Sequence, residues 1–285
     1  QCFLLASCKV FKYNIIMLTI YAPTQNLESK AWLVFEGILK SWPEETMCLD
    51  NAKATTAVDN AMFWGFVNNN LEMVHKLEKN KQTYWFADTP YFGRFDNNNL
   101  KKDNHYWRIC KNNIHAGLIT SCDTSRFDKF KIKIHPPKKD GKHILVCPSS
   151  VGIHRYLNHT TWLDDTIEKI KKHTDRPIKI RLKPRGRGTS GPSEAKISLQ
   201  EDLENAYACV TSCSISAIES ICNGVPVFCH EKSFATPVAS TKLENIESPT
   251  YADPYQWLCS LAYQQFTPEE IENKTAIKII EKFYK

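Results

Sequence analysis

The sequence lacks the patterns that most directly indicate a metal site, a membrane span or a repeat architecture. No Cys-x-x-Cys pair occurs among its 11 cysteines, which argues against a structural zinc site. No Asp-x-Asp triplet occurs either, so we expect no metal and no cofactor. No apolar run approaches the length of about 18 residues that a membrane helix needs. No repeat with a period of roughly 20 to 50 residues is evident, which argues against a solenoid.

The placement of the cysteines argues against a disulfide framework. Five of them lie inside apolar segments, where a reduced cysteine acts as a small hydrophobic side chain: Cys147, Cys209, Cys213, Cys222 and Cys229. This placement is typical of an intracellular protein, and we expect a cytoplasmic location. The chain is mildly basic, with 37 Lys and Arg against 31 Asp and Glu. That surplus is compatible with a polyanionic partner and equally with an ordinary basic surface.

The stretch "KIKIHPPKKDGK", residues 131–142, divides the chain. Its double proline and charged turn indicate a linker. We expect an N-terminal domain over residues 1–137 and a C-terminal domain over residues 143–266. Residues 267–285 begin with a capped helix start at Thr267 and form a C-terminal helix that could pack back on the N-terminal domain.

Apolar strands and helices alternate regularly after this linker. The predicted strands are 143–147, 178–182, 208–212 and 225–229, and the predicted helices are 161–173, 198–206 and 216–223. Strands joined through helices over short loops predict a parallel sheet covered on both faces, a Rossmann-like unit. The N-terminal half is less regular, with a strand at 13–23 and a helix at 28–40. The expected fold class is α/β.

Three serines lie where a predicted strand meets a helix, in "VTSCSISAIES". In a parallel α/β sheet, ligands bind at the carboxyl ends of the strands, and small hydroxyl residues beside free backbone N–H groups suit a phosphate there. Ser212, Ser214 and Ser216 occupy that place, and Glu219 could accept hydrogen bonds from a ribose diol. Simple helix capping by Ser214 and Ser216, completed by Glu219, is the better explanation of this stretch taken alone.

Two further loops at the same predicted sheet edge carry similar chemistry. The stretch "IKIRLKPRGRG" places four cations at a strand end: Arg181, Lys183, Arg185 and Arg187. Four cations are costly to assemble there unless an anion neutralises them, and a solvated charged loop is the alternative. The stretch "CPSSVG" adds Ser149 and Ser150 at the end of another strand. Three such loops together predict a pocket for a nucleotide diphosphate.

The succession "CPSSVG", "IRLKP" and "EDLENAYACVTSCSISAIESICNGVPVF" resembles the C-terminal half of GT-B-type glycosyltransferases. The resemblance covers residues 143–240, and "WFADTPYFGR" and "WLCSLAYQQFTPEEI" look similar to sugar transferases of bacteriophages. It implies two Rossmann-like domains facing across a cleft. It also implies a nucleotide sugar, such as a UDP-sugar, as co-substrate, bound mainly by the C-terminal domain.

The resemblance implies a role for each loop of the C-terminal domain. The serines would touch the diphosphate, Glu219 would bind the ribose, and the cations would balance the phosphate charge. The expected donor-binding residues are Ser149, Ser150, Arg181, Lys183, Arg185, Ser212, Ser214, Ser216 and Glu219. The chain departs from the family in Lys183, where many relatives have His, and in having no obvious Gly-rich loop near its N-terminus.

Transfer of a sugar with inversion needs a base for the acceptor hydroxyl. Asp88 is the first candidate, because it directly follows an apolar strand and precedes a loop. A turn-capping role before Pro90 explains Asp88 as well. The other candidates are Asp59, which could simply start a helix, and His75, which could be a helix-surface residue.

Aromatic and arginine side chains alternate in "QTYWFADTPYFGRFD" and "HYWRICKNN". Such a mixture suits stacking on an extruded base or on a sugar ring, and it also suits a packed core. The expected acceptor-binding residues are Tyr91, Arg94, Tyr106 and Arg108. Several phage enzymes of the GT-B fold transfer sugars onto hydroxymethylated pyrimidines. The resemblance therefore implies double-stranded DNA as a partner and the cytoplasm of an infected cell as the location.

Three hypotheses follow for the function. The first is a glycosyltransferase that moves a sugar from a nucleotide sugar to a hydroxyl group, with 5-hydroxymethylpyrimidine in phage DNA as the acceptor. The second is a glycosyltransferase that acts on a surface glycan or lipid. The third is a non-catalytic nucleic-acid-binding protein. Loss of Glu219 would spare a binding module and impair a transferase, and a DNA acceptor predicts steep salt dependence of binding.

Overall fold

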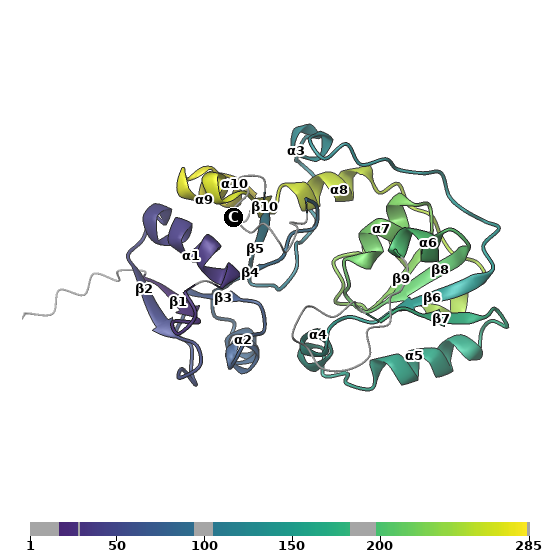
Figure 1. Ribbon diagram of the computed structural model, residues 1–285, viewed down its shortest axis with the longest axis horizontal. Coiled ribbons are helices and arrows are strands. Elements are labelled where there is room, and N and C mark those ends of the chain that lie inside the picture. Colours follow the sequence, from purple (N-terminus) through teal and green to yellow (C-terminus); the bar gives the residue numbers. More distant parts are fainter. Residues whose placement is uncertain (1–16, 28, 94–104, 183–197, 284–285) are drawn as a thin grey trace, which may run out of the picture.

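The computed structural model of the protein describes residues 17–27, 29–93, 105–182 and 198–283. Two sheets organise these residues, and each sheet has helices packed against it. The two α/β units lie side by side, connected by an extended linker and by helix α8 (Tyr255–Ala262) (Figure 1).

Within the described residues, the first sheet has six strands in the order β10-β5-β4-β3-β1-β2. They are β1 (Leu18–Ala22), β2 (Thr46–Asp50), β3 (Ala61–Trp64), β4 (Tyr84–Asp88), β5 (Trp107–Lys111) and β10 (Gln265–Phe266). Strands β1 to β4 are parallel; at one edge, β5 pairs antiparallel with β4, and β10 pairs antiparallel with β5. All five residues of β1 are buried, because a parallel strand inside a sheet is covered on both faces.

Four helices cover this sheet. They are α1 (Lys30–Ser41), α2 (Asn70–Lys79), α9 (Pro268–Glu272) and α10 (Thr275–Phe283). Alternate residues of β1 point to opposite faces, so Ile20 packs in the cluster with Phe35 of α1, whereas Tyr21 packs with Leu77 of α2. Helices α9 and α10 lie on the same face as α1.

The end of the chain completes the first unit. Phe266 of β10 pairs with Trp107 of β5, which corrects the predicted division that placed residues 265–266 in the second domain. Helix α9 packs against α1 so closely that a Cβ added to Gly37 would lie 2.9 Å from Ile271. The predicted terminal helix is two helices, because Lys274 has a φ of +68° between α9 and α10.

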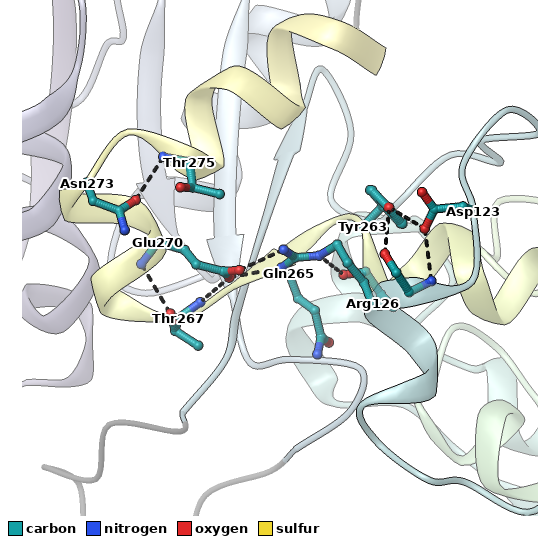
Figure 2. Close-up of polar contacts among 10 residues, drawn as sticks. Asp123, Arg126, Tyr263, Gln265, Thr267, Glu270, Asn273 and Thr275 are labelled. Atoms are coloured by element: carbon teal, nitrogen blue, oxygen red, sulfur yellow. Dashed lines mark hydrogen bonds and ion pairs between the residues drawn. The ribbon is translucent and has the colours of Figure 1, made fainter.

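A buried arginine contacts the chain segment that runs from the end of α8 through β10 to α9. Arg126 lies on the short helix α3 (Ser125–Asp128), just before the linker, and its guanidinium contacts the Glu270 carboxylate at 2.7 and 2.9 Å (Figure 2). It also donates hydrogen bonds to the carbonyl oxygens of Ala262 and Gln265. Burial favours a raised pKa for Glu270, but Arg126 outweighs it, so the pKa lies below its ordinary value. Glu270 also completes the predicted capping box with Thr267.

The second sheet has four parallel strands, among the described residues, in the order β7-β6-β8-β9. They are β6 (His143–Cys147), β7 (Ile178–Ile180), β8 (Ala206–Thr211) and β9 (Val227–Cys229). The helices are α4 (Val151–Tyr156), α5 (Trp162–Lys171), α6 (Leu199–Leu203), α7 (Ser216–Cys222) and the 3₁₀ helix η1 (Leu243–Asn245). Helix α5 packs on one face through Ile170, and α7 and α8 pack on the other. The five cysteines predicted to pack in the core are free and buried.

Gly224 ends α7 and anchors the linker. Its φ of +73° is the left-handed conformation in which a glycine commonly ends a helix, and an added Cβ would lie 2.0 Å from the Pro136 oxygen. The Gly224 carbonyl accepts a hydrogen bond from Lys138 N, and the Cys222 carbonyl accepts one from His135 N. The linker is therefore bonded along the end of α7.

Candidate functional site

The two units face a shared cavity of about 620 Å³. The first unit lines it with residues that follow β3 and β4, with one residue of β5 and with His115. The second unit lines it with residues that follow β6, β7 and β8. The carboxyl ends of parallel strands from both sheets therefore meet here, which is where open α/β sheets bind their ligands.

Ser149 lies at the centre of a hydrogen-bonded cluster on the second-unit side. Its Oγ accepts hydrogen bonds from Ser212 Oγ at 2.6 Å and from Cys213 N at 3.0 Å, and Ser149 lines the cavity. Ser150 also lines the cavity, and its Oγ accepts from Ile153 N at 3.4 Å as the N-cap of α4. Of these two serines, Ser150 serves a local capping role, while Ser149 joins two strand-end loops.

The serines after β8 divide into two groups. Ser212 is fully buried beneath the cavity, whereas Ser214 and Ser216 line it. The simple capping explanation does not describe them, because Ile215 is the N-cap of α7 and the Ser214 Oγ accepts only a loop contact from Ser216 N at 3.3 Å. Glu219 is exposed and lines the cavity one turn further on. With seven residues, α7 has a small dipole, so anion binding here would depend on hydroxyl groups and cations.

Arg181 supplies positive charge to the cavity. It follows β7 and lines the cavity, and it shares the buried carboxylate of Asp202 with Lys179. Burial favours a raised pKa for Asp202, but the two cations outweigh it and the pKa is lowered. Lys183 and Arg185 lie outside the described residues.

Asp88 faces these groups from the first unit. It is the last residue of β4, lines the cavity and is held by Arg108 Nη2 at 2.7 Å. The Asp88 side chain is 28% exposed and that of Arg108 only 3%, so the carboxylate is the accessible partner. The structure thus brings Asp88 and Arg108, predicted for different roles, into one ion pair.

The other two candidate bases lie elsewhere. Asp59 is exposed and accepts a hydrogen bond from Thr83 N at 2.6 Å, which makes it a turn-stabilising residue. His75 lies on α2, where its Nε2 is 3.1 Å from the Tyr156 carbonyl oxygen and its ring stacks on Tyr156. Neither residue lines the cavity. Of the three candidate bases, only Asp88 does.

Of the two predicted acceptor-binding tyrosines, Tyr91 is buried and Tyr106 is half-buried. Tyr91 is 4% exposed, and its hydroxyl accepts a hydrogen bond from Ala116 N at 2.7 Å. Tyr106 packs edge-on against Phe130. Neither tyrosine lines this cavity, and Arg94 lies outside the described residues. Of the described members of this predicted set, only Arg108 lines the cavity.

Sequence reasoning missed several cavity residues of the first unit. Trp64 and Phe66 place aromatic faces there after β3, and their position after an apolar strand was the available signal. His115 also lines the cavity and is 3% exposed. Burial, and then the Arg108 charge, lower its pKa well below the ordinary value, so His115 is a neutral imidazole. No sequence pattern marked His115, which follows β5 in an Asn-rich turn.

The part of the chain that the structure describes lacks two kinds of feature. It contains no cluster of three or more His, Cys, Asp or Glu side chains placed to hold a metal ion. None of its helices combines the length and the apolar character needed to cross a bilayer.

Comparison with known proteins bears on the fold. No model of a protein family matches the chain, and a search of curated proteins by sequence finds no match. Among solved structures, the chain is similar to the β-Kdo 2,4-transferase of KpsC from Thermosulfurimonas dismutans, with 9% identity and a TM-score of 0.50. That similarity covers 93% of this chain and 98% of the other. The protein has a GT-B-type fold.

Two further solved structures match more weakly. The β-Kdo 2,7-transferase of KpsC from the same organism has 13% identity and a TM-score of 0.46, over 92% of this chain and 99% of that one. The UDP-GlcNAc 2-epimerase of Methanocaldococcus jannaschii, solved with UDP-GlcNAc and UDP, has 9% identity and a TM-score of 0.33, over 92% and 98%. The expected α/β fold with two Rossmann-like domains is confirmed by the first similarity and by the two parallel sheets.

Proposed function

We propose that this protein is a glycosyltransferase that moves a sugar from a nucleotide sugar to a hydroxyl group. One observation supports this most strongly: a single cavity has hydroxyl groups and Arg181 on one wall and the accessible Asp88 carboxylate on the other. Departure of a nucleoside diphosphate requires groups that stabilise negative charge, and activation of an acceptor hydroxyl requires a base. The two walls provide these complementary groups.

The second-unit wall would bind the donor. Ser149, Ser214 and Ser216 would hydrogen-bond the diphosphate, and Arg181 would balance its charge. Glu219, at the exposed edge of the same cavity, would accept hydrogen bonds from the ribose hydroxyls. These groups would stabilise the diphosphate as the bond between its oxygen and the anomeric carbon breaks.

The first-unit wall would bind the acceptor. Asp88 would take the proton from the acceptor hydroxyl as that oxygen forms its bond to the anomeric carbon. Arg108 would position the carboxylate through their 2.7 Å contact. The proton is thereby transferred to Asp88, and the electron pair of the broken bond leaves with the diphosphate. This pathway corresponds to transfer with inversion.

For the acceptor, we favour a carbohydrate hydroxyl. Trp64 and Phe66 line the cavity beside Asp88, and aromatic faces suit the apolar face of a sugar ring. The tyrosines expected to stack on an extruded DNA base pack elsewhere. The solved structure with a similar fold is a β-Kdo 2,4-transferase, which agrees with a glycan acceptor. Hydroxymethylpyrimidine in duplex DNA is the alternative that the test distinguishes.

The test offers a panel of nucleotide sugars to the protein with oligosaccharide acceptors or with duplexes containing hydroxymethylcytosine or hydroxymethyluracil. Mass spectrometry would detect a gain of one sugar on each acceptor. A gain on an oligosaccharide is expected, and a gain on a base would replace the glycan by DNA as the acceptor. If calorimetry found no binding of any nucleotide sugar or nucleoside diphosphate, the transferase proposal would be wrong.

A further inference from the structure

A buried histidine lies behind the Ser149 cluster. His154 of α4 is 8% exposed, and its Nε2 lies 3.1 Å from Ser212 Oγ. Its ring stacks on Trp162, with the ring planes 24° apart. His154 does not line the cavity, but Ser212 connects it to Ser149, which does. The three side chains therefore form a continuous line from the interior of the second unit to the cavity wall.

Counting protons along this line fixes the direction of each hydrogen bond. Ser212 has one hydroxyl proton and donates it to Ser149 Oγ at 2.6 Å. Ser212 can then only accept from His154, so His154 Nε2 carries a proton. Burial, followed by the neighbouring His159 and His230, lowers the pKa of His154 and favours its neutral form. The imidazole is thus assigned as the neutral tautomer protonated at Nε2.

The consequence appears at Ser149. A hydroxyl oxygen has two lone pairs, and those of Ser149 are occupied by the Ser212 hydroxyl and the Cys213 N–H. The proton of Ser149 therefore needs a third partner, and Ser149 lies on the cavity wall. An oxygen atom that only accepts hydrogen bonds, such as a phosphoryl oxygen, is the matching ligand.

We propose that His154 is a positioning residue that, through Ser212, fixes Ser149 as a hydrogen-bond donor toward an anionic oxygen in the cavity. The inference rests on the proposed function and assigns a role to a residue outside the cavity. Without the N–H group of His154, the buried Ser212 oxygen can accept from Ser149 instead. The Ser149 proton is then divided between Ser212 and the ligand, which weakens binding.

The experiment measures binding of nucleoside diphosphates to four variants by calorimetry. His154→Phe keeps a ring on Trp162 and removes the N–H group, whereas His154→Gln can place an amide N–H near the same position. We expect His154→Phe to raise the Kd about three- to tenfold, the range of one net hydrogen bond, and His154→Gln to change it less than about twofold. Ser149→Ala should raise the Kd about tenfold. Adding His154→Phe to Ser149→Ala should cause no further loss, because His154 acts only through the Ser149 hydroxyl.

His173→Phe provides the matched control, because His173 lies just beyond α5 in the same unit and does not line the cavity. Its Kd should equal that of the unmodified protein. If His154→Phe binds as tightly as the unmodified protein, or if its effect adds to that of Ser149→Ala, the positioning role is wrong. If the unmodified protein binds no nucleoside diphosphate, the proposed function itself fails, so the two failures are distinguishable. Thermal unfolding of each variant would show whether it is folded.

Discussion

The two units of this protein differ in how their cavity walls are assembled. The wall of the second unit comes from loops after β6, β7 and β8, which belong to successive strand–helix units of one parallel sheet. The wall of the first unit depends on the Asp88–Arg108 pair, whose partners come from neighbouring antiparallel strands. That unit is itself completed by β10, α9 and α10 from the end of the chain. The second-unit wall is thus built from successive strand–helix units, whereas the first-unit wall belongs to a sheet with antiparallel edge strands, one of them from the end of the chain.

The largest expected effect separates the chemistry of the two walls. Asp88→Asn should lower kcat about a thousandfold and leave the Kd for a nucleoside diphosphate within about twofold, because it removes a base and no donor contact. Steady-state kinetics and calorimetry would measure the two quantities. Asp59→Asn is the matched control, since Asp59 contacts Thr83 N away from the cavity, and its kcat should be unchanged. A normal kcat for Asp88→Asn would remove Asp88 from the mechanism.

The next effect concerns the dependence of the first unit on the end of the chain. Glu270→Gln leaves the buried Arg126 without its carboxylate, so the free energy of unfolding should fall by about 3 kcal/mol in urea titrations at neutral pH. Glu272→Gln is the control on the same helix, because Glu272 forms an exposed pair with Lys40, and no measurable change is expected. Equal stabilities of the two variants would contradict the role of Arg126 in holding the C-terminal segment to the first unit.

The same pair predicts a pH dependence. The pKa of Glu270 is lowered in the folded protein, so its contribution is complete above the ordinary glutamate pKa of about 4.3 and is lost as the pH falls through the lower folded value. Glu270→Gln cannot lose this contribution. The difference in the free energy of unfolding between the unmodified protein and Glu270→Gln should therefore shrink on acidification, as urea titrations at several pH values would show.

A smaller effect is expected from Arg181 on the cavity wall of the second unit. Arg181→Gln should raise the Kd for a nucleoside diphosphate about ten- to hundredfold, because it removes a charged hydrogen bond to phosphate while Lys179 still neutralises Asp202. Arg155→Gln, an exposed change on α4, should leave the Kd unchanged. An unchanged Kd for Arg181→Gln would show that the diphosphate lies elsewhere. Calorimetry at two salt concentrations would measure both variants.

The smallest effect concerns the contact between the units. The Tyr156 hydroxyl at the end of α4 donates to Glu78 of α2 at 2.7 Å, and Glu78 also accepts from Tyr84. Tyr156→Phe should lower the free energy of unfolding by about 1 kcal/mol, the value of one hydrogen bond. The Kd for a nucleoside diphosphate should stay the same, since Tyr156 does not line the cavity. A large loss of affinity would show that the two walls are coupled through α4.

Local patterns predicted much of the second unit. The strand at 143–147 and the helix that begins at Ser198 were predicted because each depends on a few neighbouring residues, and so was the capped helix start at Thr267 in the first unit. The placement of Asp88 at the cavity was predicted for a similar reason, since it ends a buried strand. The roles of Asp59, His75, Tyr91 and Tyr106 were not, because polar and aromatic residues near strand ends serve turns and cores as often as sites.

The sequence by itself determined the alternation of strands and helices, the strand-end serines and the cations after β7, because periodicity and helix capping act over short distances. Only the tertiary structure decided that Asp88 pairs with Arg108, that His154 contacts Ser212, and that the last residues complete the first sheet. Each of these contacts joins segments whose proximity depends on the order of strands in a sheet or on packing between helices and sheets. No local pattern of residues encodes that order.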